Sequence, residues 1–312
     1  MNEFDIIHRF FNRPGSGDGV TLGIGDDAAV VRVPPGYELV LAMDTLIHGV
    51  HFPESTAADD IGWKALAVNL SDLAAMGAEP CWATLSLTLP EADESWLQAF
   101  ADGFFEMADK HRVSLIGGDL CRGPLTVTVQ AHGLVPAGQA ITRHGAVPGD
   151  LIYVTGHLGD AGYALASAVA GSSDYAYFRE RLDRPQPRVR TGVALRGIAS
   201  SAIDLSDGLA GDIRHIMKAS YCGAVIEAGR LPLSEPLRSA VDEETGSRLA
   251  LTSGDDYELC FTVSADQAGT LESRMASIGE TVKQVGKITA SSDLIFRAAD
   301  GEQHYSAYSH FG

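Results

Sequence analysis

The chain has 312 residues, 45% of them hydrophobic, which is enough for about two domains with a core each. It carries 23 basic and 41 acidic residues, so its formal net charge is −18. This charge argues against nucleic acid and anionic membranes as partners. It also repels phosphorylated metabolites unless cations bridge them to the protein.

The same sequence argues for a cytoplasmic protein. No apolar run reaches the roughly eighteen residues that a membrane-spanning helix needs. The opening stretch MNEFDIIHRFF has no basic region followed by an apolar one, so we expect no signal peptide. The four cysteines lie far apart and form no C-x-x-C motif, a pattern typical of reduced thiols inside the cell.

In the first half of the chain, hydrophobic periodicity predicts a hairpin followed by helices and strands. The expected elements are hairpin arms at 28–33 and 38–43 around Pro34-Pro35-Gly36, a helix at 59–76, a strand at 81–89, a helix at 94–110, and strands at 113–116 and 125–131. The strand 81–89 alternates cleanly between apolar and polar residues, so one of its faces is expected to be buried.

A stretch rich in proline and glycine at 136–149 is expected to link two domains, at 1–140 and 141–312. The elements expected after it are a strand at 151–154, helices at 161–169 and 189–199, a strand at 202–205, a helix at 209–220, and strands at 224–227, 258–263 and 294–297. Because strands and helices alternate in both halves, we expect two α/β domains.

Glycine next to aspartate recurs at the ends of apolar strands, as in Gly25-Asp26-Asp27 and Gly254-Asp255-Asp256. Any single instance is explained by turn chemistry. Asp44, Asp72 and Asp204, however, lie outside such dipeptides. Asp72 lies within an apolar helix pattern where an unpaired carboxylate would be costly, and the nearest lysine is two turns away. Oxygen ligands without a Cys/His cluster favour Mg²⁺, Mn²⁺ or Ca²⁺.

The common nucleotide-binding motifs are absent. Gly286-Lys287 is followed by Ile288, so no P-loop is present. The segment 23–28 fits the glycine pattern of dinucleotide-binding folds, but it would place two aspartates against the phosphates and precedes a strand where that motif needs a helix. No G-x-S-x-G elbow is present either.

Two further residues have both a structural and a functional interpretation. His51 follows the Asp44 strand, where it is either an ordinary surface histidine or part of the site. Arg143, in the predicted linker, is either a solvated charge or a clamp for phosphate, to which its forked guanidinium is suited.

Five segments together resemble the thiamine-monophosphate kinase family, part of a wider group similar to aminoimidazole ribonucleotide synthetase. They are Leu22-Gly-Ile-Gly-Asp-Asp27, the stretch 64–78 (KALAVNLSDLAAMGA), Ile116-Gly-Gly-Asp119, the stretch 202–209 (AIDLSDGL) and the stretch 254–259 (GDDYEL). They occur in the family's order, and the resemblance covers essentially the whole chain.

The resemblance implies an N-terminal α/β domain whose sheet pairs with that of a second subunit, and a C-terminal α/β domain that completes the site. It implies a homodimer that converts ATP and thiamine monophosphate into ADP and thiamine diphosphate with several Mg²⁺ ions. By the same resemblance, the magnesium ligands are Asp27, Asp44, Asp72, Asp119 and Asp204, with Asp207 holding a further ion.

The remaining implied roles concern the two substrates. The expected nucleotide contacts are Gly118, Asp119, Arg143 and Ser206, of which Arg143 also offsets charge in the transition state; the expected contacts of thiamine monophosphate are His51, Asp255 and Tyr305. The chain departs from what is common in the family at three places: Ala42-Met43 stands for a Ser-Thr pair, Asp255 for a glutamate and Tyr305 for a tryptophan.

The physical argument agrees with this chemistry, because two anionic substrates need bridging cations to meet in a protein this acidic. Two alternatives remain open. One is another ATP-using member of the group; a selenophosphate synthetase would need a reactive cysteine near the N-terminus, where the first here is Cys81, and a hydrogenase-maturation relative would need one in the C-terminal tail, which has none. The other is a nucleotide-binding module without catalysis.

Overall fold

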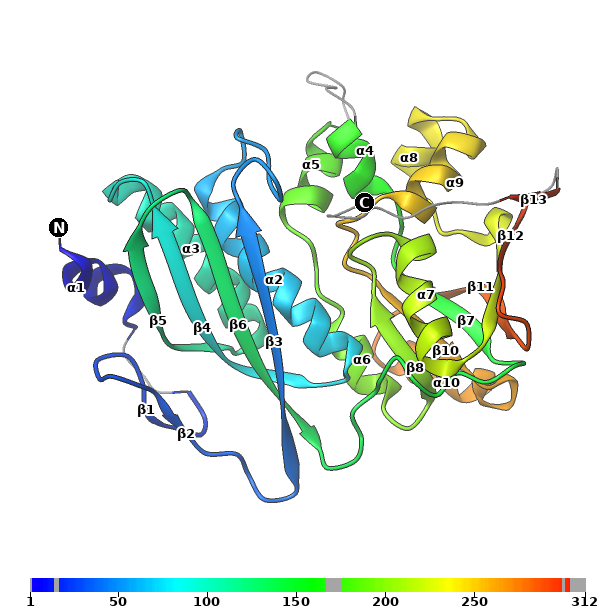
Figure 1. Ribbon diagram of the computed structural model, residues 1–312, viewed down its shortest axis with the longest axis horizontal. Helices are drawn as coiled ribbons and strands as arrows, with labels where there is room; N and C mark the ends of the chain where they lie inside the picture. The colour runs from blue at the N-terminus through cyan, green and yellow to red at the C-terminus, as the bar shows by residue number, and fades with distance from the viewer. Residues whose placement is uncertain (1, 14–16, 167–174, 299–300, 304–312) are drawn as a thin grey trace. The chain divides into compact units, whose positions relative to one another are not determined.

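The computed structural model describes residues 2–13, 17–166, 175–298 and 301–303. The chain forms two compact units (Figure 1). The first comprises residues 1–73 and 78–138, and the second comprises 74–77 and 139–312.

The first unit is built on a four-stranded sheet in the order β3-β6-β4-β5. Its strands are β3 (Tyr37–Ile47), β4 (Glu79–Leu89), β5 (Ser114–Arg122) and β6 (Thr126–Pro136). β6 runs antiparallel to both β3 and β4, while β4 and β5 are parallel. The helices α2 (Ala58–Ala75) and α3 (Glu94–His111) lie together on one face of this sheet (Figure 1).

The alternation predicted for residues 81–89 is confirmed over most of β4. Ala83, Leu85, Leu87 and Leu89 are buried, while the threonines and serine between them are only partly buried. Trp82 departs from the pattern because β4 is irregular there: the indole is buried and its Nε1 donates to the carbonyl of Asp18 at 3.0 Å.

The predicted hairpin is wrong. The strand β2 (Val30–Val31) pairs with β1 (Val20–Leu22), and β3 pairs along its whole length with β6, from Tyr37 opposite Pro136 to Ile47 opposite Thr126. The turn at Pro34-Pro35-Gly36 does reverse the chain, but β3 gains eleven paired residues with β6, far more than the short arm before the turn offers.

The second unit has a seven-stranded sheet in the order β13-β12-β9-β11-β7-β10-β8. Its strands are β7 (Leu151–Thr155), β8 (Ala199–Asp204), β9 (Gly223–Glu227), β10 (Leu259–Val263), β11 (Val282–Thr289), β12 (Leu294–Ala298) and β13 (Gly301–Gln303). Among the strands of this sheet that the structure describes, only β9 and β12 are paired in parallel. The sheet is therefore mixed and mainly antiparallel.

The helices of this unit are α4 (Asp160–Ala166), α5 (Tyr175–Asp183), α6 (Val189–Leu195), α7 (Leu209–Ser220), α8 (Glu235–Ala240), α9 (Glu243–Thr252) and α10 (Ala268–Ser277). The core joins sheet residues such as Val154 and Ile226 to helix residues such as Ile213 and Leu249. β1, β11, β13, α5, α8, α9 and α10 were not foreseen from periodicity. Within the described residues, no helix is both long and apolar enough to cross a membrane.

Two short N-terminal helices belong to the first unit. α1 (Glu3–Ile6) begins at Asn2, whose side chain accepts a hydrogen bond from the backbone N–H of Asp5 while Asp5 reciprocates, a capping box. It continues into a π-helical turn, Ile7–Phe11, with Phe10 and Phe11 buried. This segment forms one wall of the cavity described next.

Candidate functional site

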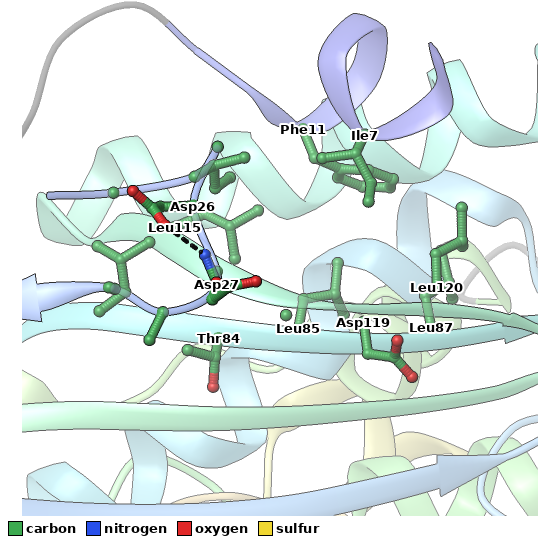
Figure 2. Close-up of a pocket in the computed structure, with 18 of the residues that line it drawn as sticks. Ile7, Phe11, Asp26, Asp27, Thr84, Leu85, Leu87, Leu115, Asp119 and Leu120 are labelled. Carbon is green, nitrogen blue, oxygen red and sulfur yellow. Dashed lines mark hydrogen bonds between the residues drawn. The ribbon is translucent and has the colours of Figure 1, made fainter. Parts of the chain in front are cut away.

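A cavity of about 600 Å³ lies in the first unit (Figure 2). Ile7 and Phe11 of the N-terminal segment line one side, and the loop 23–29 together with the strands β4 and β5 line the rest. Figure 2 shows the carboxylates of Asp27 and Asp119 on the strand side of the cavity, away from Ile7 and Phe11. The cavity therefore combines an apolar wall with a polar region that includes the carboxylates of Asp27 and Asp119.

The polar region depends on glycines that bring the backbone close. Gly118 has φ 153, and a side chain there would collide with the carbonyl oxygen of Leu85 on β4. Only glycine lets β5 pass at this spacing and leaves its backbone open toward the cavity. Asp119 follows directly, opposite Ser86 in the parallel ladder, and its Oδ2 accepts a hydrogen bond from the Cys121 thiol at 3.1 Å.

Asp44 and Asp72 are brought together elsewhere in the first unit. Asp44 lies on β3 and Asp72 on α2, and a side-chain hydrogen bond joins them. Burial raises the pKa of Asp44, while the bond to Asp72 and the charge of His51 act in the opposite direction. Two carboxyl groups in contact need a shared proton or a cation, so this pair fits a divalent metal ion.

Asn69 fixes the geometry of that pair. Its Oδ1 accepts the backbone N–H of Asp44 at 3.0 Å, and its Nδ2 donates to the carbonyl of Ala65 one turn back, also at 3.0 Å. The Asn69 side chain is fully buried, and its hydrogen bond to Asp44 links α2 to β3 at that residue. The i, i+3 spacing of Asn69 and Asp72 in the sequence was the signal for this shared face.

His51 lies in a turn that is anchored from both sides. Its Nδ1 accepts the backbone N–H of Ile47 at 3.0 Å, and its carbonyl accepts from Nζ of the buried Lys64 at 3.4 Å. The ring is close enough to Asp44 for its charge to influence that carboxyl. The structure thus places His51 beside the acidic pair of the first unit.

In the second unit, Asp204, Ser206 and Asp207 lie where β8 leads into α7. Asp204 is buried at the end of β8, and Gly208, with φ 93, begins the helix. Asp212 in the first turn of α7 accepts the backbone N–H of Asp207 at 3.1 Å. Burial, followed by the charge of Asp204, raises the pKa of Asp212 to about 8.

A second loop, which carries Asp255, is hydrogen-bonded to this one. The N–H of Asp255 donates to the carbonyl of Ser206 at 3.0 Å, and the N–H of Tyr257 donates to the carbonyl of Leu205 at 2.8 Å. At Gly254, a side chain would collide with the Ser206 carbonyl, so glycine is required for the two loops to meet. The motifs 202–209 and 254–259 therefore form one paired structure.

Arg143 is exposed in the irregular segment that opens the second unit, and its carbonyl accepts from the Ser220 hydroxyl at 3.2 Å. The charge of Arg143 influences the pKa of His215 on α7. Burial lowers the pKa of that imidazole, as does the charge of Arg143, while Asp207 raises it. Arg143 and Asp207 therefore lie on the same side of the second unit.

The predicted site residues thus fall into local groups, Asp27 with Gly118 and Asp119, Asp44 with Asp72 and His51, and Asp204 with Ser206, Asp207 and Asp255. Within the described part of the chain, no three acidic, histidine or cysteine side chains converge as a ready metal site. Tyr305 lies outside the described residues. Sequence reasoning missed the supporting acids Asp212, Asp256 and Glu258; the last two are within the quoted motif 254–259, which was the available signal.

Comparison with known proteins gives matches along the whole chain. Residues 25–135 match the family model "AIR synthase related protein, N-terminal domain", and residues 147–298 match "AIR synthase related protein, C-terminal domain". The chain is 47% identical over 318 aligned residues to a protein of Escherichia coli strain K12 named thiamine-monophosphate kinase, with 99% of this chain and 98% of that relative covered.

Solved structures agree with the sequence matches. A thiamine-monophosphate kinase crystal structure from Stenotrophomonas maltophilia is similar with a TM-score of 0.85 and 47% identity, covering 96% of this chain and 95% of that one. A structure described as "AaThiL complexed with AMPPCP and TMP" is similar with a TM-score of 0.79 and 25% identity, covering 99% and 96% of the two chains.

Proposed function

The chain belongs to the thiamine-monophosphate kinase family of the AIR synthase related proteins, and we propose that it transfers the γ-phosphoryl group of ATP to thiamine monophosphate. The products are ADP and thiamine diphosphate. The observation that carries the proposal is the cavity of the first unit, which offers an apolar wall for a base and a glycine-and-carboxylate region for metal-bound phosphates.

We assign the nucleotide to this cavity. The adenine lies against Ile7, Phe11 and Leu115, which line it, and the phosphates lie near Gly118 and Asp119. The missing side chain at Gly118 lets a phosphate approach the backbone closely. Ser206 and Arg143 take the nucleotide-binding roles that family membership implies, and the guanidinium of Arg143 offsets charge in the transition state.

The aspartates hold magnesium in this proposal. Asp27, Asp44, Asp72, Asp119 and Asp204 are its ligands, and Asp207 holds a further ion. The contact between the Asp44 and Asp72 carboxyl groups supports the assignment, because a hard divalent cation removes the repulsion between them. When bound, magnesium neutralises the phosphate oxygens and keeps donor and acceptor aligned.

The acceptor brings its own nucleophile. The phosphate of thiamine monophosphate has a second pKa of about 6, so at neutral pH it is largely ionised and needs no general base. His51 and Asp255 orient the thiamine end, with Tyr305 as a third contact. The Nδ1 of His51 is already occupied as an acceptor for Ile47, which fits an orienting role better than proton transfer.

The test compares two acceptors. The protein is incubated with ATP, Mg²⁺ and either thiamine monophosphate or free thiamine, and the thiamine species are separated by chromatography. We expect thiamine diphosphate from the monophosphate and no phosphorylation of free thiamine, whose hydroxyl would need a base. Efficient use of free thiamine would refute the base-free mechanism. Failure with both acceptors, in folded protein with magnesium, would favour a nucleotide-binding module or another ATP-using reaction.

We further propose that the enzyme works as a cytoplasmic homodimer paired through the sheet of the first unit. Leu39, Leu41 and Met43 of β3 remain exposed, and the last two expose 55% and 59% of their surface. An apolar row of this kind on a strand is suited to burial against a second copy. The predicted apolar face of β4 instead packs inside the unit.

A further inference from the structure

The segment from Gly254 to Glu258 has an unusual backbone. Asp255 has φ 67 and Tyr257 has φ 49, so two residues with side chains adopt the left-handed conformation within three positions. This region is disfavoured for side-chain-bearing residues and persists only where the surroundings hold it. The residues between and after them, Asp256 and Glu258, show what holds it.

Asp256 anchors the middle of the segment. It is 3% exposed, and its Oδ1 and Oδ2 accept the backbone N–H of Gly159 at 3.0 and 2.9 Å. Gly159 directly precedes α4, so the contact also places the carboxyl at a helix N-terminus. Its neighbour Asp255 is only half-buried, so the two adjacent aspartates have different surroundings.

Glu258 anchors the end of the segment. It is 1% exposed and forms a bidentate pair with Arg188, with Nε–Oε2 and Nη2–Oε1 both at 2.6 Å. Arg181 adds a bond to Oε1 at 3.1 Å, and the hydroxyl of Thr155 donates to Oε2 at 2.6 Å. At Gly156 a side chain would overlap the carboxyl of Glu258, so the close packing of this carboxyl requires glycine there.

The electrostatics keep Glu258 ionised. Burial alone raises the pKa of Glu258, but the hydrogen bonds and charges of Arg188 and Arg181 outweigh it and bring the pKa below its ordinary value. Buried ion pairs of this kind add little stability over apolar packing of the same volume. Their use here, immediately beside a strained backbone, points to control of conformation.

We propose that Asp256 and Glu258 are positioning residues that lock the left-handed turn at Asp255 and so present its carboxylate to the thiamine end of the acceptor. This inference rests on the proposed function, because the contact between Asp255 and thiamine monophosphate is part of that proposal. Neither positioning residue contacts substrate; each acts through the backbone of the segment.

The test uses Asp256→Ala and Asp256→Asn, with Asp255→Ala as reference. Steady-state kinetics give KM for each substrate and kcat, and calorimetry gives the Kd of thiamine monophosphate in the presence of ADP. We expect Asp256→Ala to raise KM and Kd for thiamine monophosphate on the order of tenfold, because small displacements of an orienting group are costly. KM for ATP stays within about twofold. Asp256→Asn keeps a side-chain oxygen that can accept the backbone N–H of Gly159. We expect this variant to retain most of the wild-type affinity for thiamine monophosphate.

Asp150→Ala is the matched control. Asp150 is also buried in the second unit and accepts from the backbone of Val147 at 3.1 Å and from the hydroxyl of Ser200 at 2.5 Å. Asp150 lies just before β7, at the opposite end of that strand from Thr155, the residue that donates to Glu258. Its loss should lower Tm and leave KM for thiamine monophosphate unchanged. If Asp256→Ala does not fold, Glu258→Gln, which keeps the side-chain shape, is measured in its place.

The outcomes separate this inference from the proposed function. If Asp255→Ala weakens acceptor binding while Asp256→Ala behaves like Asp150→Ala, lowering only Tm, the positioning role is overturned and the proposed function stands. If the wild type binds thiamine monophosphate without converting it, the proposed reaction fails, and the Kd values of the variants still decide the positioning role. A wild type that neither binds nor converts it overturns both.

Discussion

Residues of one chemical type take different roles in this chain because their surroundings differ. Asp27 and Asp119 are exposed beside the cavity, where they can meet a metal-bound phosphate from solvent. Asp44 is partly buried against another carboxyl, whereas Asp256 is fully enclosed and bonded to backbone. The first kind of environment suits a ligand for a diffusing ion, and the last suits a structural anchor.

The acidic pair of the first unit gives a direct prediction. We expect Asp72→Asn to leave the fold intact and to lower turnover by at least about a hundredfold, because it removes a proposed metal ligand without changing side-chain volume. Activity at saturating Mg²⁺ and Tm are measured together. Turnover close to that of the wild type would remove Asp72 from the ligand set.

His111, at the end of α3, predicts part of the pH dependence of stability. Burial, with a smaller effect of Lys110, lowers its pKa from 6.5 to about 4. Its Nε2 is buried and makes no hydrogen bond within the described part of the chain. Position at a helix C-terminus favours a charged imidazole, but desolvation outweighs that effect here.

The folded state therefore disfavours protonated His111, and its contribution to stability is lost as pH falls from 6.5 toward 4. We expect Tm to drop on acidification from about pH 7 to about pH 5, and His111→Gln to reduce that drop. His8→Gln, which changes an exposed histidine, is the control and should leave the pH profile unchanged. Equal profiles for all three proteins would contradict the assignment.

At the scale of the element, β5 depends on one glycine for its contact with β4. Gly118→Ala forces a side chain into the Leu85 carbonyl and should cost about 2 kcal/mol of folding free energy. It should also raise KM for ATP, because Asp119 moves with the strand. Chemical denaturation and steady-state kinetics measure the two effects.

The adjacent Gly117→Ala is a control on the same strand. A side chain at Gly117 meets only the Thr84 methyl group at 3.9 Å, an ordinary contact. This variant should therefore keep nearly the wild-type stability. If both glycine variants lose the same stability, the close approach at Gly118 is not what shapes the strand.

For the molecule as a whole, the exposed row on β3 predicts the oligomeric state. We expect light scattering to give twice the 33.0 kDa mass of the chain. Leu41→Asp places a charge in the middle of the row and should shift the protein toward the monomer. Tyr221→Asp, at a residue that is 92% exposed in the second unit, should not. A wild-type mass of 33.0 kDa would contradict the dimer.

The sequence by itself determined the positions of most elements and the local composition of the site. α2, α3, α7 and β4 lie within a few residues of their predicted ranges. Periodicity succeeds there because each element buries one face, which the order of residues along the chain records directly. The motifs likewise placed aspartates and glycines next to one another without any knowledge of the fold.

Only the tertiary structure decided which segments meet. β3 pairs with β6 instead of forming a local hairpin, and Glu258 finds its partners in Arg188 and Thr155, at positions 70 and 103 residues earlier. The N-terminal segment likewise becomes a wall of the cavity, although its sequence carries no binding motif. Pairing between distant segments depends on the free energy of the whole packed arrangement, in which many weak contacts compete, and no local pattern in the chain records that sum.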